Sequence, residues 1–173
     1  TFREDTRGAQ IRLGKMLSPY VGTRIALRYN DVDISNLPSI GYPTLRHERG
    51  DGTTVSLIWG INRNTVDLVR DPSSGSNHDL MVELAGLGGD YNYYRLGHDS
   101  TWYRSFGKDK KWVASYRSRQ GWINEYGDSD FVPVSSRYFA GGTSTIRGYE
   151  TDKIGPYERR FVFFGKKKPI GGE

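Results

Sequence analysis

The sequence predicts an all-β protein whose strands form an antiparallel, up-and-down transmembrane β-barrel. About six segments alternate apolar and polar residues with period two, which is the pattern of a strand with two different faces. Several of them run for roughly ten residues, the length that a tilted strand needs to cross a bilayer. Aromatic residues make up 13% of the chain, including 12 tyrosines, whereas hydrophobic residues make up only 35%. This composition favours strands that face lipid and water over a packed soluble core.

The alternating segments follow one another along most of the chain. The earliest and weakest covers about residues 10–17, with Ile11 and Leu13 on one face. In the next five, most alternate positions are apolar or aromatic, over residues 25–29, 55–61, 80–84, 94–102 and 112–116. No segment has the 3.6-residue apolar stripe of a helix, so we expect strands at roughly residues 10–122.

The connections between these segments support hairpins joined in sequence order. Residues 18–22, 71–75 and 107–110 are short and rich in turn-forming residues. Residues 30–52 form a longer polar stretch. Short turns on one side and long loops on the other are typical of a membrane barrel.

The two faces of the expected strands differ in chemistry. One carries Leu, Ile, Val, Trp and Tyr, and the other carries ionic residues: Arg24, Arg28, Glu83, Arg95, Asp99, Arg117 and Arg119. These faces would meet lipid and a wet lumen in a barrel, or core and solvent in a soluble sandwich, and alternation alone leaves both open. Aromatic residues near strand ends are typical of interfacial girdles and equally of cross-strand pairs: Tyr91, Tyr93, Trp102, Tyr103, Trp112 and Trp122.

Several classes of function are disfavoured by the residues that the chain contains. It has no cysteine, which excludes thiolate metal sites and cysteine nucleophiles. Its three histidines, His47, His78 and His98, lack the spacing of metal ligands. No nucleotide-binding or nucleophile motif occurs, and the net charge of +5 comes without the aromatic pattern of a nucleic-acid-binding module. We therefore expect no enzyme activity, no cofactor, no metal and no nucleic-acid partner.

Residues 137–156 read RYFAGGTSTIRGYETDKIGP and form the most specific motif of the chain. They place Arg147 between turn-forming residues in the middle of a polar segment. Gly148 lets the backbone turn without the steric cost of a Cβ atom. An arginine on such a turn offers a rigid fork to a carboxylate. The motif therefore predicts a site at which Arg147 meets an acidic partner.

The same residues resemble the sixth extracellular loop of the Omp85 superfamily of outer-membrane β-barrels. The family pattern is an aromatic entry, Ala-Gly-Gly, small hydroxyl residues, Val/Ile-Arg-Gly-Phe/Tyr and then Gly-Pro. The matching positions are Tyr138, Phe139, Ala140, Gly141, Gly142, Thr143, Ser144, Thr145, Ile146, Arg147, Gly148, Tyr149, Gly155 and Pro156. Residues 169–172 resemble the end of that loop, and residues 71–75 more loosely resemble a family turn.

The resemblance covers most of the chain as strand order and is specific mainly in the loop. It implies one partial barrel domain over residues 1–173, with about six strands of a sixteen-stranded barrel and the long loop at roughly 127–172. In the family, POTRA domains precede the barrel, and they are absent from these 173 residues. Both ends of the sequence are expected to be continued by further strands.

In the family the loop folds back into the lumen, and its arginine pairs with an acidic residue on a strand that follows the loop. The resemblance therefore implies a functional motif made of Ile146, Arg147, Gly148 and Tyr149, with Tyr149 packed against the inner wall. It implies that the loop is supported by Phe139, Ala140, Gly141, Gly142, Gly155 and Pro156. The acidic partner is expected beyond Glu173, with Asp99 and Glu83 as substitutes within the chain.

The implied role is to fold β-barrel proteins and insert them into the bacterial outer membrane. The partners would be the outer-membrane bilayer, unfolded β-barrel clients and accessory lipoproteins of an assembly complex. A secretion or translocation pore of the same superfamily, such as a two-partner secretion transporter, is an alternative because it shares the Arg-Gly-Tyr loop. A soluble β-sheet binding module is a second alternative.

Overall fold

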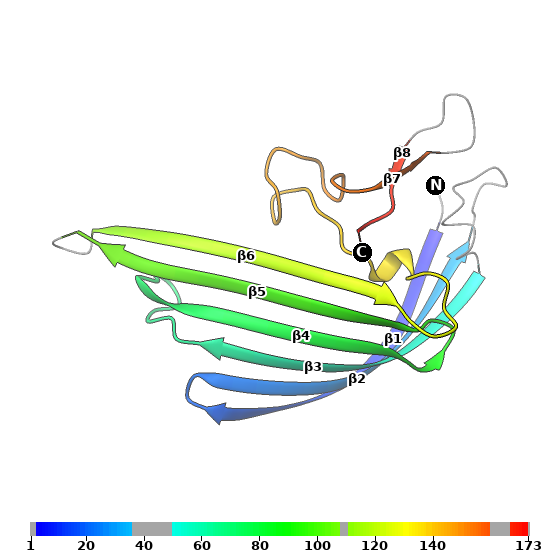
Figure 1. Cartoon of the computed structure of the whole chain (residues 1–173), viewed down its shortest axis with the longest axis horizontal. Coiled ribbons are helices and arrows are strands. Elements are labelled where there is room, and N and C mark those ends of the chain that lie inside the picture. Colours follow the sequence, from blue (N-terminus) through cyan, green and yellow to red (C-terminus); the bar gives the residue numbers. More distant parts are fainter. Residues whose placement is uncertain (1–2, 36–49, 108–110, 160–166, 173) are drawn as a thin grey trace.

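The computed structural model describes residues 3–35, 50–107, 111–159 and 167–172. They form a six-stranded antiparallel sheet in which every strand pairs with the next one along the chain. Figure 1 shows this sheet as curved and strongly twisted, with the segment after the last strand turned back beside it. The strands are β1 Arg3–Ser18, β2 Val21–Ser35, β3 Gly50–Asn64, β4 Ser74–Gly89, β5 Tyr93–Phe106 and β6 Trp112–Glu125. The prediction of about six antiparallel up-and-down strands is confirmed.

The strands are longer than the alternating segments that predict them, at 14 to 16 residues each. Residues 30–35, which the sequence assigns to a loop, continue β2 and pair with β1 as far as Arg3↔Ser35. Backbone hydrogen bonding in a ladder needs no apolar side chains, so pairing continues beyond the apolar stretch of each strand. No helix among the described residues is long and apolar enough to cross a membrane.

The two faces of the sheet carry the chemistry that the alternation predicts. On the outer face, large apolar side chains stay open to the surroundings, including Leu27 (49% exposed), Trp59 (43%) and Leu96 (40%). On the inner face lie small and ionic residues, of which Ser56 and Glu83 are buried. So large an exposed apolar surface is typical of strands that contact lipid. The outer face is therefore the membrane face of the sheet.

Three of the expected girdle residues lie on the outer face, and their exposed fractions are 38% for Trp102, 65% for Trp112 and 61% for Trp122. Trp102 also stacks on Tyr116 across the β5–β6 pair, with ring centroids 5.4 Å apart, so cross-strand pairing occurs as well. The girdle prediction is wrong for Tyr93, which is 3% exposed. Tyr93 lies one residue away from the outward Tyr94, and successive strand residues point to opposite faces.

The segment after β6 packs onto the end of the sheet where β4 and β5 are joined. A small core forms there from Ala85, Tyr93, Ile123 and Val132. The 3-10 helix η1, Val134–Ser136, follows this core and leads the chain back over the sheet. The expected loop also contains a two-stranded ribbon of β7, Tyr157–Arg159, and β8, Lys167–Pro169.

The turn between β3 and β4 is organised by one carboxylate, Asp67. It accepts hydrogen bonds from the backbone N–H groups of Leu68 (2.9 Å), Ser73 (3.0 Å) and Ser74 (3.2 Å). The Ser73 hydroxyl donates a further bond of 2.6 Å. These donors, with the Ser73 hydroxyl contributing most, hold the pKa of Asp67 well below its usual value.

This lowered pKa predicts how the turn responds to acid. The hydrogen bonds favour the ionised form, so their stabilisation is complete above the unfolded-state pKa and is lost as the pH falls through the lower folded-state pKa. The NMR amide shifts of Ser73 and Ser74 should therefore stay constant down to about pH 4 and change only in stronger acid. In an Asp67→Asn variant this titration should disappear. A midpoint at or above the ordinary aspartate value of 3.8 would contradict the role of Asp67.

Candidate functional site

The loop that carries Arg147 is closed at its base and held across its middle. At the base, Tyr138 and Gly172 form a bridge in which the two backbone N–H groups donate to the partner's carbonyl oxygens at 3.3 and 2.8 Å. Further along, the N–H of Ile154 donates to the carbonyl oxygen of Ala140 at 2.9 Å. These contacts leave the residues around Arg147 as the tip of a closed structure.

The tip itself is built around glycine. Gly141 has φ +119° and Gly148 has φ +91°, in the region that other residues rarely adopt. The hydroxyl of Thr145 accepts from the N–H of Gly141 at 2.8 Å and donates to its carbonyl oxygen at 2.7 Å. The N–H of Gly142 donates to the carbonyl oxygen of Tyr149 at 3.1 Å. The motif residues therefore fold onto themselves in a defined turn.

Tyr138 anchors the start of the loop in a slot on the inner face. Gly97 of β5 and Gly121 of β6 lie directly opposite each other, and the Tyr138 ring covers both. A Cβ atom at Gly121 would lie only 2.6 Å from the ring carbon Cζ, so this position requires glycine while the ring is in place. The Tyr138 hydroxyl donates to the carbonyl oxygen of Leu96 at 2.7 Å, and the Arg95 guanidinium lies 5.0 Å from the ring centroid.

A second tyrosine uses the same arrangement nearer the end of the sheet. Tyr126, just after β6, donates its hydroxyl hydrogen to the carbonyl oxygen of Ala85 in β4 at 2.6 Å. A Cβ atom at the neighbouring Gly86 would lie 2.6 Å from that hydroxyl. In both places a tyrosine from beyond β6 reaches the backbone of an earlier strand beside a glycine.

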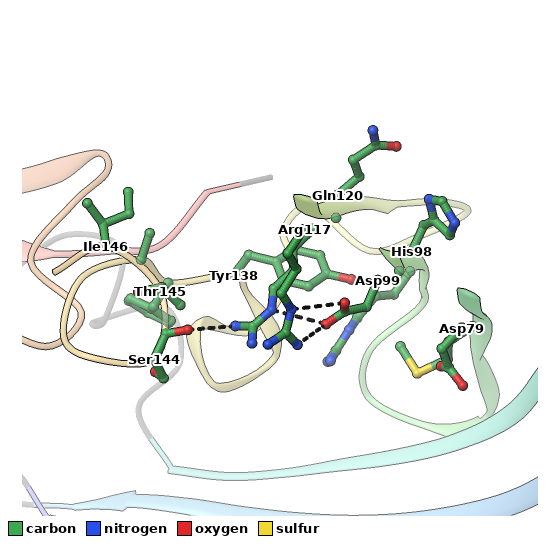
Figure 2. Close-up of a pocket in the computed structure, with 16 residues that line it drawn as sticks. Asp79, His98, Asp99, Arg117, Gln120, Tyr138, Ser144, Thr145 and Ile146 are labelled. Carbon is green, nitrogen blue, oxygen red and sulfur yellow. Dashed lines mark hydrogen bonds and ion pairs between the residues drawn. The ribbon is translucent and has the colours of Figure 1, made fainter. Parts of the chain in front are cut away.

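Asp99 holds two arginines of the next strand. Arg117 donates to Asp99 Oδ1 at 3.2 Å through Nε, and Arg119 donates to Asp99 Oδ2 at 3.0 Å through Nε. Arg119 also donates through a terminal nitrogen to the carbonyl oxygen of Ser144 in the loop, at 2.9 Å. Figure 2 shows Asp99, Arg117 and Ser144 gathered around these bonds, with Tyr138 beside them. The loop is thus attached to the wall by a second, ionic contact.

A second ionic group lies deeper on the inner face, at Glu83. Its side chain is only 1% exposed and lies 3.3 Å from Arg28 and 3.9 Å from Arg95. The Ser56 hydroxyl donates to Glu83 Oε1 at 2.8 Å. Arg95 in turn donates to the carbonyl oxygen of Ser136 at 3.4 Å, so this group connects four strands of the wall, β2 to β5, to the segment that leads into the loop.

Between the loop and the wall lies an open groove of about 700 Å³. Its wall side includes Asp99, Arg117 and Arg119, and its loop side includes Ser144 and Ile146 (Figure 2). No group of three or more potential metal ligands occurs among the residues that the structure describes. The groove thus has ionic groups on its wall side and is bounded on the other side by the docked loop.

The predicted functional motif lies at the exposed tip of the loop. Ile146 is 44% exposed and lines the groove, whereas Arg147 and Gly148 are exposed and do not belong to its lining. Tyr149 is 61% exposed, so the expectation that its ring packs against the inner wall is wrong for the described strands. The backbone of Tyr149 is used to close the turn, and the residues before Arg147 contact the wall in its place.

Arg147 forms no hydrogen bond or ion pair with any residue in the described ranges. Asp99 is occupied by Arg117 and Arg119, and Glu83 lies between two other arginines. Neither carboxylate substitutes for the expected partner of Arg147.

The predicted supporting residues are brought together around the base and middle of the loop. Ala140 and Gly141 make the backbone bonds described above, and Gly142 is buried beside Gly141. Phe139 lies beside Gly171, where an added Cβ atom would come within 3.1 Å of its ring. Gly155 has φ +137°, and the carbonyl oxygen of Pro156 accepts from the N–H of Ile170 at 3.0 Å.

Two features of the site are missing from the sequence-based prediction. The glycine slot depends on Gly97 and Gly121 facing each other, and the signal was present as an inward glycine in each of two neighbouring strands. The second is a pair of histidines far apart in the sequence, His78 and His98, whose rings stack with centroids 5.9 Å apart. His47 lies outside the described residues.

The fold and the docked loop define a class of protein, an outer-membrane β-barrel whose long loop folds back onto its inner wall. The whole chain, residues 1–173, matches the Omp85 superfamily domain and belongs to this superfamily. The protein is accordingly located in the bacterial outer membrane, as the sequence predicts.

Known relatives agree with this family at low sequence identity. The chain is 26% identical to the outer membrane protein assembly factor BamA of Neisseria meningitidis serogroup B, over 99% of this chain and 22% of that protein. It is 26% identical to a SAM50-like protein of Schizosaccharomyces pombe, over 73% of this chain and 27% of that protein. The chain therefore spans about a quarter of the length of these relatives.

Among solved structures, the chain resembles BamA from Haemophilus ducreyi lacking POTRA domains 1-3. The TM-score is 0.86 at 22% sequence identity, over 99% of this chain and 35% of that one. At this identity the likeness supports the barrel fold alone.

Proposed function

We propose that this chain is part of an outer-membrane assembly factor that folds β-barrel proteins and inserts them into the outer membrane. Two curated relatives, from Neisseria meningitidis and Nitratidesulfovibrio vulgaris, carry the name outer membrane protein assembly factor BamA. The proposed partners are the bilayer, unfolded β-barrel clients and accessory lipoproteins. No cofactor and no catalytic step are proposed.

The observation that carries the proposal is the loop docked on the inner wall with Arg147 at its tip. We propose that Arg147 pairs with a carboxylate on a strand beyond Glu173. A planar guanidinium makes two parallel hydrogen bonds to a carboxylate, and shielding from bulk water strengthens the pair. The pair would join this wall to the strands that follow the loop, and so would stabilise one closed arrangement of the barrel.

The proposed mechanism uses strand pairing. A barrel that opens between two strands offers unpaired backbone N–H and C=O groups to an incoming chain. A client hairpin satisfies these groups by adding strands at that edge, which lets it enter the bilayer without exposing its own backbone to lipid. The loop, held by the Arg147–carboxylate pair, would keep the other strands of the barrel in place while the edge is open.

Depletion of the protein in cells tests this function. If it is an assembly factor, several unrelated outer-membrane proteins should lose their folded, heat-modifiable forms together, in proportion to the depletion. If it is a secretion or translocation pore of the same superfamily, one secreted cargo should disappear while the other outer-membrane proteins fold normally. The second result would overturn the proposal.

The soluble binding module is set aside because of the outer face. Its large apolar side chains, Trp59 and Leu96 among them, are about 40% exposed. The chain that carries them belongs to a superfamily of membrane barrels. Water would be an unfavourable neighbour for this surface.

A further inference from the structure

Two arginines share one carboxylate on the inner wall, and among the described residues only Arg119 also hydrogen-bonds to the loop. Arg117 and Arg119 lie two residues apart on β6, so both point to the inner face, and Arg119 lies directly opposite Asp99. Arg117 makes both of its hydrogen bonds to Asp99. Arg119 makes one bond to Asp99 and one to the carbonyl oxygen of Ser144.

We infer that Arg119 is a positioning residue, which fixes Ser144 and through it the turn that presents Arg147. The inference rests on the proposed role of Arg147 as the latch of the loop. Asp99 fixes the guanidinium of Arg119 from the wall side, so its remaining N–H groups point at the loop. Arg119 thereby adds a second attachment, at Ser144, six residues along the chain from the one at Tyr138.

The attachment point lies close to the functional residue in sequence and in structure. Ser144 precedes Thr145, whose hydroxyl closes the turn onto Gly141 at both its N–H and its carbonyl oxygen. A displacement of Ser144 would therefore strain or break those bonds. The turn that starts there ends where the N–H of Gly142 meets the carbonyl oxygen of Tyr149, and Arg147 lies inside it.

The chemistry of the contact requires arginine. One planar guanidinium bonds a carboxylate with one edge and a carbonyl oxygen with another, in a fixed geometry. Lysine keeps the charge but offers a single, strongly hydrated ammonium group. An Arg119→Lys variant should therefore hold the loop less well than the native protein, although its net charge is unchanged.

Spin labels on the loop and the wall test the inference in the full-length protein in its native membrane. The 173 residues contain no cysteine, so labels can be placed through Thr143→Cys in the loop and Ser115→Cys on the inner face of β6. With Arg119 present, the distance distribution should be narrow. In Arg119→Gln the docked population should fall about tenfold, because hydrogen bonds to charged groups are among the stronger ones in proteins.

Arg117→Gln is the matched control, since it removes the same charge from the same strand and the same carboxylate without removing a loop contact. We expect its distance distribution to equal that of the native protein. An unchanged distribution in Arg119→Gln would overturn the inference. Equal broadening in both variants would also overturn it, because the charge around Asp99 would then matter and the bond to Ser144 would not.

The assembly of outer-membrane proteins, measured in the same strains, separates this inference from the proposed function. A loop released in Arg119→Gln together with lost assembly supports both. A released loop with normal assembly supports the positioning role of Arg119 and contradicts the proposed role of the loop. A loop that stays docked in Arg119→Gln, while Arg147→Ala abolishes assembly, contradicts the positioning role alone.

Discussion

Replacing Arg147 with alanine should reduce the population of molecules in which the loop is held by the proposed carboxylate by about 10- to 100-fold. The reason is that hydrogen bonds to charged groups contribute about 1.5–3 kcal/mol. The alanine variant would leave the turn itself intact, since its internal bonds use Gly141, Thr145 and backbone groups. The measurement is the amount of heat-modifiable outer-membrane protein in cells that depend on the variant. We expect a severe loss at normal levels of the variant protein.

Lys153→Ala is the control for Arg147→Ala. Lys153 is an exposed cation of the same loop, and the hydrogen bond that the structure gives it comes from its backbone N–H. Its replacement should leave assembly unchanged. Arg147→Lys should behave much more like alanine than like arginine, since an ammonium lacks the two-pronged geometry. Normal assembly of outer-membrane proteins in the alanine variant would refute the proposed role of the Arg147–carboxylate pair.

Replacing Gly121 with valine should expel the Tyr138 ring from its slot. An added Cβ atom would lie 2.6 Å from ring carbon Cζ, far inside contact distance. Overpacking of this kind costs about 1–3 kcal/mol, and loss of the hydroxyl bond to Leu96 adds about 0.5–1.5 kcal/mol. Valine is otherwise favoured in strands, so any destabilisation reports on Tyr138 rather than on β6. Protease access to the loop and thermal unfolding in detergent measure the two effects.

Gly97→Ala is the milder partner of this substitution. There the added Cβ atom would lie 3.4 Å from the Tyr138 hydroxyl, close to ordinary contact, so we expect little change. The double variant Tyr138→Ala, Gly121→Val provides the decisive comparison. Once the ring is absent, valine at position 121 should cost nothing further, so the two effects should be less than additive. Full additivity would show that Gly121 serves some other purpose.

The strands and their faces could be predicted because each depends on local alternation. Leu27, Leu57 and Leu96 belong to different strands, yet all lie outward as the pattern requires. The exact ends could not be predicted, since residues 30–35 pair through their backbone although Val32 and Ile34 break the phase in which Leu27 and Tyr29 alternate. The girdle prediction fails at Tyr93 and also at Tyr103, because alternation along β5 places both on the inner face with Asp99.

The candidate site could be predicted only where its residues are adjacent in sequence. The Arg-Gly-Tyr motif and the glycines around it are contiguous in the sequence, and together they predict an arginine exposed on a tight turn. The contacts that dock this turn join Arg119 to Ser144 and Tyr138 to Leu96. These residues are far apart in the sequence, so only the folded structure shows that they are in contact. The exposure of Tyr149 could not be predicted either, because the loop meets the wall through the distant pair Arg119 and Ser144.

The pairing of Gly97 with Gly121 has a consequence for how the barrel matures. A slip of β6 by two residues against β5 would keep every side chain on its proper face, so alternation alone would not oppose it. Such a slip would replace Gly121 by Arg119 or Ile123 under the tyrosine ring, and the slot would be filled. The loop can therefore dock only when β5 and β6 are paired in the register that places Gly97 opposite Gly121. We therefore expect the loop to dock only after β5 and β6 have paired in this register.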